Sequence, residues 1–314
     1  MKRGFVTIAT GDEQYYKIAY NLLRSYRYFS SDPLPFAIVC DKENSFTEAF
    51  DDVIILENAT RSYIDKLSLL KVIPYDETIF IDADCLAYSD LNVFFDIFDG
   101  ADDISCFGVV LPKESEDGFF KLCNIGSYAE RVKFCIDMHG GIMFFRKNDI
   151  LNKVYDTCCE IKDHYYEYKF KYFKKPADEP LMALSMAFYG LHPVSSVNPA
   201  NGEYPIFSFY PVDEKKLNVD ILNGKARVKR GSFKYSVILV HFGTVSTKEK
   251  MYLLEEENLN LLCDGKSSKN SLRAFFKPYR FSLFADNMRK KYNRWLYNTK
   301  CTVKPILMKL LRRK

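Results

Sequence analysis

A short apolar run that ends in two carboxylates constrains this chain more than any other feature. Residues 78–81 read Thr-Ile-Phe-Ile, which is the composition and length of a buried strand, and Asp82 and Asp84 follow directly. Open α/β sheets place ligands outside the carboxyl ends of their strands, where these two side chains are expected. Carboxylate oxygens are hard ligands that suit Mg²⁺ or Mn²⁺ and the phosphates that such ions carry. An isolated Asp-x-Asp pair can also be a solvated acidic turn. The surrounding sequence must therefore distinguish a ligand-binding pair from such a turn.

Strand-like and helix-like segments alternate up to the Asp-x-Asp pair, which predicts βαβ crossovers and a doubly wound α/β sheet. The predicted strands cover residues 4–10, 36–40, 53–56 and 78–81, and the predicted helices cover residues 13–29 and 64–73. The second half is expected to be α+β and to lie over the first. There the pattern predicts strands over 104–111, 141–146 and 237–242 and helices over 150–167 and 179–189.

The length of 314 residues suits one large domain or two closely packed ones. The nine cysteines are an odd number without a Cys-x-x-Cys pair, and several lie in apolar runs, which is typical of reduced core cysteines in a cytosolic protein. The apolar run after the first three residues is too short for a signal peptide. No stretch approaches the roughly 18 apolar residues of a membrane span. We therefore expect a cytoplasmic protein.

His241 is a candidate metal ligand, because it ends an apolar strand and is followed by Phe242 and Gly243. A satisfied core histidine is the alternative. If its strand lies beside the strand of Asp82, one imidazole and two carboxylates form a mixed nitrogen and oxygen site. Such a site favours Mn²⁺ over Mg²⁺ or Ca²⁺.

Two other short motifs admit both a structural and a functional interpretation. Gly140 and Gly141 precede a predicted strand, so they either form an ordinary turn or let the backbone approach a ligand. Asp178 precedes Pro180 at a helix start, which suits an N-cap residue. A capped helix N-terminus is also a rigid platform for a functional carboxylate, here Asp178 or Glu179.

Five segments, in order along residues 4–250, resemble the GT-A-fold, metal-dependent glycosyltransferases, and most closely glycosyltransferase family 8, which includes glycogenin and bacterial lipopolysaccharide galactosyltransferases. The segments are residues 5–10 with Asp12 and Tyr15, Lys66-Leu followed after fourteen residues by Asp82-Ala-Asp84, His139-Gly-Gly, Ala177-Asp-Glu-Pro and Leu239-Val-His-Phe-Gly. Five ordered matches are far more specific than any single one.

The chain departs from the family pattern in three places. His139 replaces an Asn, Glu179 replaces a Gln, and the lysine of the family's His-x-x-Gly-x-x-Lys-Pro-Trp motif is either Lys248 or Lys250 here. These changes concern the contacts to the donor sugar, the acceptor and the diphosphate.

The resemblance implies a GT-A fold with a mostly parallel central sheet flanked by helices. It implies a nucleotide-sugar-binding half over residues 1–100 and an acceptor-binding and catalytic half over residues 101–264. The implied reaction moves a hexose or N-acetylhexosamine from a UDP-sugar to a glycan or lipid-linked glycan, with retention, in bacterial surface polysaccharide or lipopolysaccharide synthesis. The implied site comprises a Mn²⁺ or Mg²⁺ ion on Asp82, Asp84 and His241, the catalytic residues Asp178 and Glu179, and the donor-binding residues Ala9, Thr10, Tyr15, Lys66, Asp82, Ala83, His139, Gly140, Gly141 and Lys248.

Two other functions remain open on the sequence. In a haloacid-dehalogenase-type phosphatase, Asp82 is the nucleophile and Asp84 the acid, but that class places the motif on its first strand. A catalytically inactive sugar-nucleotide-binding scaffold keeps donor binding without transfer. A nucleotidyltransferase is disfavoured, because the expected glycine-rich loop with an Arg is missing after the first strand.

The C-terminal tail, residues 265–314, is strongly basic. It carries fifteen Lys or Arg against one acid, a net charge of +14, whereas residues 1–264 carry 30 basic and 40 acidic residues, a net charge of −10. Aromatic and apolar residues recur at helical spacing between residues 281 and 295 among basic ones, which predicts a helix that binds an anionic membrane surface through residues 270–314. Packing of that stripe on the body is the alternative. Nucleic acid is disfavoured because no reading motif accompanies the charge. We expect a peripheral protein on the inner face of the membrane.

Overall fold

The computed structural model describes residues 1–115, 117–172, 174–195, 206–208, 217–230, 233–244, 246–265, 288, 289 and 292. The chain divides into two compact units, Met1–Thr247 and Lys248–Lys314, and each is described by itself. The predicted membrane-binding segment lies almost entirely outside the described residues. Among the described helices, none has the length and apolar composition needed to cross a membrane.

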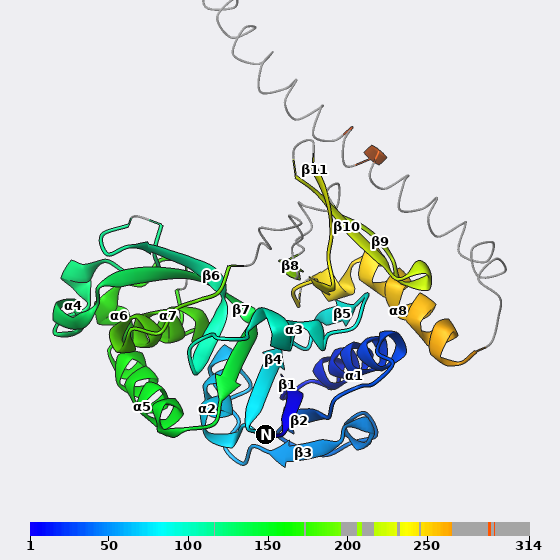
Figure 1. The fold of residues 1–314 in the computed structure, drawn as a ribbon, viewed down its shortest axis with the longest axis horizontal. Coiled ribbons are helices and arrows are strands. Elements are labelled where there is room, and N and C mark those ends of the chain that lie inside the picture. Colours follow the sequence, from blue (N-terminus) through cyan, green and yellow to red (C-terminus); the bar gives the residue numbers. More distant parts are fainter. Residues whose placement is uncertain are drawn as a thin grey trace, which may run out of the picture. The chain divides into compact units, whose positions relative to one another are not determined.

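The first unit is built on a six-stranded sheet with the order β3-β2-β1-β4-β7-β6 (Figure 1). Its parallel strands are β1 (Arg3–Ala9), β2 (Phe36–Cys40), β3 (Asp52–Ile55) and β4 (Glu77–Ile81). Strand β7 (Phe134–Arg146) is antiparallel to β4 and to its other neighbour, β6 (Ile104–Pro112). Every strand except β7 therefore runs in the same direction, which confirms the predicted mostly parallel α/β sheet.

Helices cover both faces of this sheet, as the alternation of side chains along its strands requires. On one face, Phe5 of β1 packs edge-on against Tyr26 of α1 (Glu13–Phe29), with ring centroids 5.0 Å apart. On the other face, Val6 and Phe80 belong to the core that includes residues of α2 (Leu69–Val72), α5 (Asp149–Asp163) and α7 (Asp178–Tyr189). Figure 1 shows α1 and α5 on opposite sides of the sheet.

Two small sheets complete the first unit. One has the order β5-β12-β8 and contains β5 (Cys85–Ala87), β12 (Leu239–His241) and β8 (Ile206–Ser208). The other has the order β11-β10-β9 and contains β9 (Leu217–Asp220), β10 (Lys225–Arg230) and β11 (Phe233–Ser236). The mixed metal site was made conditional on the strand of His241 lying beside the strand of Asp82. The strand of His241 pairs with the following strand, β5, with His241 opposite Cys85.

Most predicted elements are present, with corrections at their boundaries. Helix α1 and strand β2 have the predicted bounds. The helix predicted over 64–73 is a 3-10 helix, Tyr63–Ser68, followed by the single α-turn of α2. The helix predicted over 150–167 is divided into α5 and α6 (Tyr165–Tyr168). The strand predicted over 141–146 is the end of the thirteen-residue β7, and the strand predicted over 237–242 is shortened to β12.

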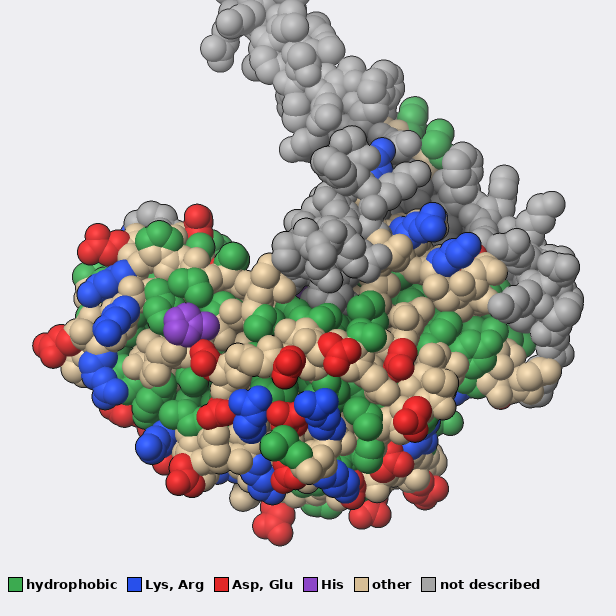
Figure 2. All heavy atoms as spheres, in the orientation of Figure 1, with side chains coloured by type: hydrophobic (Ala, Val, Ile, Leu, Met, Phe, Trp, Pro, Cys, Tyr) green, Lys and Arg blue, Asp and Glu red, His purple; other side chains and the backbone are tan. Residues whose placement is uncertain are grey.

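Several elements were not predicted from the sequence, among them α3 (Val93–Ile97), α4 (Tyr128–Arg131) and the 3-10 helix Leu122–Asn124. In the second unit, α8 (Lys250–Cys263) buries Tyr252, Leu254 and Leu259. On the face shown in Figure 2, acidic and basic side chains are interspersed over the described part of the surface.

Candidate active site

The two carboxylates of the Asp-x-Asp pair lie buried at the carboxyl end of β4. Asp82 and Asp84 are 9% and 8% exposed. The Asp82 amide donates a hydrogen bond to the Gly141 carbonyl at 2.9 Å, which ties the end of β4 to β7. The chain then enters β5, whose pairing with β12 brings His241 to the same place. Its Nε2 lies 2.9 Å from Asp84 Oδ1 and 3.6 Å from Asp82 Oδ2.

The donor atoms at this point fit a divalent cation. Asp84 Oδ1 is buried and forms an ion pair with His241 Nε2 at 2.9 Å. Thr244 donates a hydrogen bond to the other oxygen of Asp84 at 3.1 Å. A buried carboxylate beside an imidazole nitrogen offers the mixed oxygen and nitrogen donors that a divalent cation can bind.

The Cys85 thiol also lies near the metal-binding atoms, since one donor atom each from Asp84, Cys85 and His241 fall within 4.8 Å of one another. Burial raises the pKa of this thiol well above its usual value. A metal ligand must be the thiolate, so Cys85 is a poor ligand at neutral pH. Asp82 is the better third donor, and two carboxylates with one imidazole suit Mn²⁺ or Mg²⁺.

Charge pairing sets the protonation of the candidate ligands. Burial raises the pKa of Asp84, but the neighbouring His241 outweighs this and holds the pKa below its usual value. Burial lowers the pKa of His241, but Asp84 and Asp82 outweigh it and raise that pKa. The two carboxylates therefore make the protonated form of His241 more favourable than it is in water.

Lys66 connects the carboxylates to the start of α7. Its Nζ lies 2.7 Å from Asp82 Oδ1 and 3.4 Å from Asp178 Oδ2. Burial lowers the pKa of Lys66, but Asp178 and Asp82 outweigh it and raise the pKa. Lys66 therefore stays charged, and its pairing with two acids fixes its position.

The paired glycines lie inside β7 rather than in a turn, so the turn interpretation is wrong. The register between β6 and β7 shifts between Cys106 and Phe107, which pair with Met143 and His139, so residues 140–142 bulge out of that pairing. A Cβ on Gly140 would lie 2.7 Å from Glu179 Cγ, and a Cβ on Gly141 would lie 2.6 Å from His139 Cε1. Glycine is needed here because the backbone passes directly against side chains.

His139 contacts the candidate ligand His241. The Nδ1 atom of His139 accepts a hydrogen bond from the Gly141 amide at 3.0 Å, and its Nε2 lies 3.4 Å from His241 Nδ1. Burial, reinforced by the charge of His241, lowers the pKa of His139 to about 3, so its imidazole is neutral. His139 therefore packs against the other ring nitrogen of the candidate metal ligand His241.

The carboxylates of the Asp-Glu-Pro motif begin α7 without capping it. Ala177 occupies the N-cap position and forms no side-chain cap, so the expected N-cap role of Asp178 is wrong. Asp178 is buried and faces Lys66 instead. Glu179 Oε1 accepts a hydrogen bond from the Gly140 amide at 2.9 Å. Burial, together with the charge of Asp178, raises the pKa of Glu179 to about 7.

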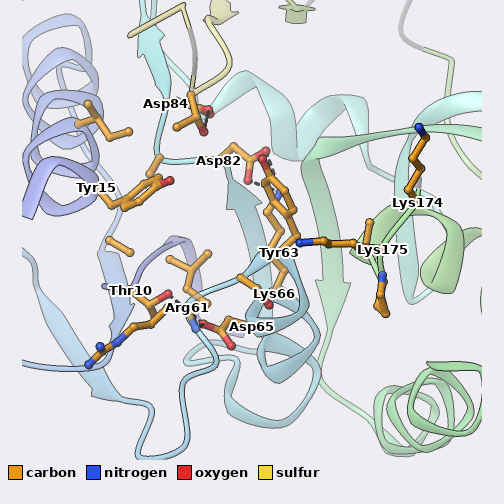
Figure 3. A pocket seen from close by; sticks show the side chains of 18 of the residues that line it. Thr10, Tyr15, Arg61, Tyr63, Asp65, Lys66, Asp82, Asp84, Lys174 and Lys175 are labelled. Atoms are coloured by element: carbon orange, nitrogen blue, oxygen red, sulfur yellow. Dashed lines mark hydrogen bonds and ion pairs between the residues drawn. The ribbon is translucent and has the colours of Figure 1, made fainter. Parts of the chain in front are cut away.

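A cavity of about 730 Å³ opens in front of these residues (Figure 3). It is lined by the predicted residues Ala9, Thr10, Tyr15, Lys66, Asp82, Ala83 and Asp84. The other predicted residues of the first unit are not part of this lining: His139, Gly140, Gly141, Asp178, Glu179 and His241. Asp178 contacts the lining residue Lys66, and His241 contacts the lining residue Asp84. Lys248 is exposed and belongs to the second unit.

Sequence reasoning missed the two loops that supply the rest of the lining. One contains Arg61, Ser62, Tyr63 and Asp65, and the other contains Tyr172, Lys174, Lys175 and Pro176. Asp65 shapes the first loop, because its carboxylate accepts hydrogen bonds from the amides of Thr60 and Arg61 and from the hydroxyl of Thr10. The signal for the second loop was the basic and aromatic run over residues 168–175, which precedes the Asp-Glu-Pro motif.

Neither a protein-family model nor a curated protein matches the chain. Solved structures that are similar to it include the bifunctional glycosyltransferase WbbM, with 16% identity over 62% of this chain and 38% of WbbM and a TM-score of 0.41. The galactosyltransferase LgtC in complex with donor and acceptor sugar analogues is 11% identical over 86% of this chain and 99% of LgtC, with a TM-score of 0.47. Mouse xyloside xylosyltransferase 1 is 10% identical over 78% of this chain and 99% of its own, with a TM-score of 0.46. All three are glycosyltransferases, the class that the sequence resembles.

Proposed function

We propose that this chain is a metal-dependent glycosyltransferase that moves a hexose or N-acetylhexosamine from a UDP-sugar to a glycan acceptor, with retention of configuration. The observation that carries the proposal is that His241 Nε2 lies 2.9 Å from Asp84 Oδ1 and 3.6 Å from Asp82 Oδ2, and that both aspartates line one cavity. Lys66 and the exposed ring of Tyr15 line the same cavity.

The proposed donor site assigns a task to each group. Asp82, Asp84 and His241 hold Mn²⁺ or Mg²⁺, which supplies the positive charge that stabilises the leaving diphosphate. Tyr15 stacks on the base, with Ala9 and Thr10 beside it. Lys66, fixed by its two acids, keeps Asp82 oriented and contributes a buried positive charge beside the phosphates.

Asp178 and Glu179 are the proposed catalytic residues. The Gly140 amide holds one oxygen of Glu179, and Lys66 holds Asp178, so both carboxylates have fixed positions. In its ionised form Glu179 stabilises positive charge that develops at the anomeric carbon of the sugar. Because its pKa is raised to about 7, both protonation states are populated near neutral pH.

The place of the motif in the fold disfavours the phosphatase alternative, because the two carboxylates follow the fourth strand of the chain rather than the first.

A screen of nucleotide sugars for Mn²⁺-dependent hydrolysis and transfer tests the proposal. We expect one UDP-sugar to be consumed by the wild type and to be left intact by Asp84→Asn, with unchanged thermal unfolding. Asp99→Asn is the matched control, because Asp99 is exposed and follows α3. Substantial transfer by Asp84→Asn, with or without Mn²⁺, contradicts the metal assignment. Nucleotide binding without any turnover favours the inactive scaffold.

We further propose that the acceptor is a lipid-linked glycan of bacterial surface polysaccharide or lipopolysaccharide synthesis, reached from the inner face of the membrane. The support is the net charge of +14 over residues 265–314. Anionic lipid attracts each basic side chain near its surface.

A further inference from the structure

The loop that leads into α7 brings two lysines to the edge of the cavity. Lys174 and Lys175 both line it and are both exposed. Figure 3 shows that the ammonium end of Lys175 points into the cavity, toward Tyr63, whereas the side chain of Lys174 extends away from it. Adjacent residues of the same charge thus differ in direction, and only Lys175 is aimed at the space that a ligand fills.

Unusual backbone conformations mark the two loops at this edge. Among the described residues, the non-glycine residues with positive φ are Arg61 at 59°, Lys169 at 51° and Tyr172 at 69°. Arg61 lies two residues before Tyr63, and the other two lie just before Lys174. Such conformations are costly for residues with a Cβ and are found preferentially where loops hold ligands.

The position of Lys175 relates it to the second substrate rather than to the nucleotide. Figure 3 places Tyr15 and Thr10 across the cavity from Lys175, with Asp82 between. With the base at Tyr15 and the diphosphate at the Asp-x-Asp pair, the transferred sugar extends toward the start of α7. Lys175 lies three residues before Asp178 and on the opposite side of the cavity from Tyr15 and Thr10, which leaves this side for a second substrate.

The same edge offers surface for a sugar ring. The side chains of Tyr63 and Tyr172 line the cavity and are 62% and 75% exposed. Flat, exposed aromatic rings next to a cation suit a ligand with both a ring and a negative charge. The net charge of −10 over residues 1–264 repels an anionic ligand, so a local positive charge is needed to bind one here.

We propose that Lys175 binds a negatively charged group, a phosphate or a carboxylate, on the acceptor glycan. The proposal rests on the proposed glycosyltransferase function and specifies its second substrate. Lys175 is a specificity residue for the acceptor, and Lys174 is not.

The test compares three acceptor analogues that differ in one group: methyl β-D-glucopyranoside, its 6-phosphate and methyl β-D-glucuronide. Their dissociation constants are measured by NMR titration against protein saturated with UDP and Mn²⁺, for the wild type, Lys175→Met and Lys174→Met. We expect the wild type to bind at least one anionic glycoside about tenfold more tightly than the neutral one, as a charge-assisted hydrogen bond allows. Lys175→Met is expected to abolish this preference, and Lys174→Met to change it less than about twofold.

Each other outcome has a defined meaning. A preference for only the phosphate or only the glucuronide identifies the charged group. No anionic preference in the wild type, or equal losses in both variants, overturns the proposal. If Lys175→Met weakens UDP itself and leaves the glycoside preference intact, Lys175 belongs to the donor site and the acceptor assignment is wrong. If the wild type binds UDP and hydrolyses a UDP-sugar but fails these tests, only the acceptor proposal is wrong. If the wild type binds no nucleotide, the proposed glycosyltransferase function is wrong.

Discussion

The pKa of Glu179 is shifted into the range near neutral pH, where the shift can be tested. Its Oε1 accepts a hydrogen bond from the Gly140 amide, and its pKa is raised from an ordinary 4.5 to about 7 by burial and by Asp178. Where the resembling family has a neutral Gln, this chain has an acid that is half neutral near pH 7.

This shift predicts a pH-dependent stability. Because the folded-state pKa of Glu179 is above its unfolded value, its contribution is full below pH 4.5 and is lost as pH rises through 7. We expect Glu179→Gln to unfold at a higher temperature than the wild type at pH 8 and to differ little at pH 5. At 1.36 kcal/mol per pKa unit, the advantage at pH 8 is at most about 3 kcal/mol. Thermal unfolding at both pH values checks this, with the exposed Glu13→Gln as control, and equal differences at the two pH values contradict it.

The raised pKa of His241 predicts that metal binding depends on pH. Asp84 and Asp82 raise its pKa, and a metal ligand must lose its proton, so protons compete with the cation. We expect the affinity for Mn²⁺, measured by electron paramagnetic resonance titration, to fall by up to about tenfold per pH unit below the pKa of His241. His241→Ala is expected to bind Mn²⁺ weakly at every pH. An affinity that does not change between pH 5.5 and 8 excludes His241 as a ligand.

At the scale of single residues, the sequence indicated the candidate metal ligands but not the loops that line the cavity. Asp82 and Asp84 directly follow a strand with a clear apolar composition, and His241 ends another such strand. The position of each strand end in the sequence was therefore enough to find these residues. Lys175 lies in a loop whose path depends on positive φ values at Lys169 and Tyr172, and nothing in the residue types at those positions predicts a left-handed conformation.

The element that places His241 is the short strand β5, which is anchored to helix α1. The fully buried Ser25 of α1 accepts a hydrogen bond from the Ala87 amide at 2.9 Å and donates one to the Leu22 carbonyl at 2.8 Å. Strand β5 in turn pairs with β12, which carries His241. One hydroxyl group therefore connects helix α1 to the small sheet that carries the candidate ligand His241.

Replacing this hydroxyl tests the connection. Ser25→Ala leaves the Ala87 amide buried without its partner, so we expect a loss of about 1–3 kcal/mol in the free energy of unfolding. Urea unfolding measures it, with the exposed Ser31→Ala as the control that is expected to change little. Because β5 positions β12, we also expect weaker Mn²⁺ binding by Ser25→Ala under native conditions. Unchanged stability shows that water or a shift of β5 satisfies the amide.

At the scale of elements, local patterns predicted most strands and helices but not their partners. The βαβ alternation predicted the parallel part of the sheet, because that topology follows from the order of elements. The pairing of β12 with β5 depends on a contact between residues about 150 positions apart, which no local period encodes. Strand β7 was truncated in the prediction because Gly140 and Gly141 interrupt its pattern, whereas in the structure they form the bulge against Glu179 and His139.

At the scale of the whole molecule, charge is distributed unevenly along the chain. The net charge is +14 over residues 265–314 and −10 over residues 1–264. The two parts therefore respond oppositely to an anionic surface, which attracts the tail and repels the body. Attraction by anionic lipid is worth about 1 kcal/mol for each basic side chain near the surface and falls off within a Debye length of about 10 Å at 0.1 M salt.

This asymmetry predicts that the tail alone drives membrane binding. We expect the full chain to sediment with vesicles that contain phosphatidylglycerol and to bind them less tightly as the salt concentration rises. We expect it not to sediment with vesicles of phosphatidylcholine alone. Deleting residues 270–314 removes most of the positive charge, so vesicle binding should fall by more than about tenfold, since only a few basic side chains at about 1 kcal/mol each account for that change. Thermal unfolding and Mn²⁺ affinity should stay the same, which separates loss of the tail from damage to the first unit. If the truncated chain binds the anionic vesicles as well as the full chain, the tail is not the anchor, and packing of its aromatic stripe on the body becomes the better explanation.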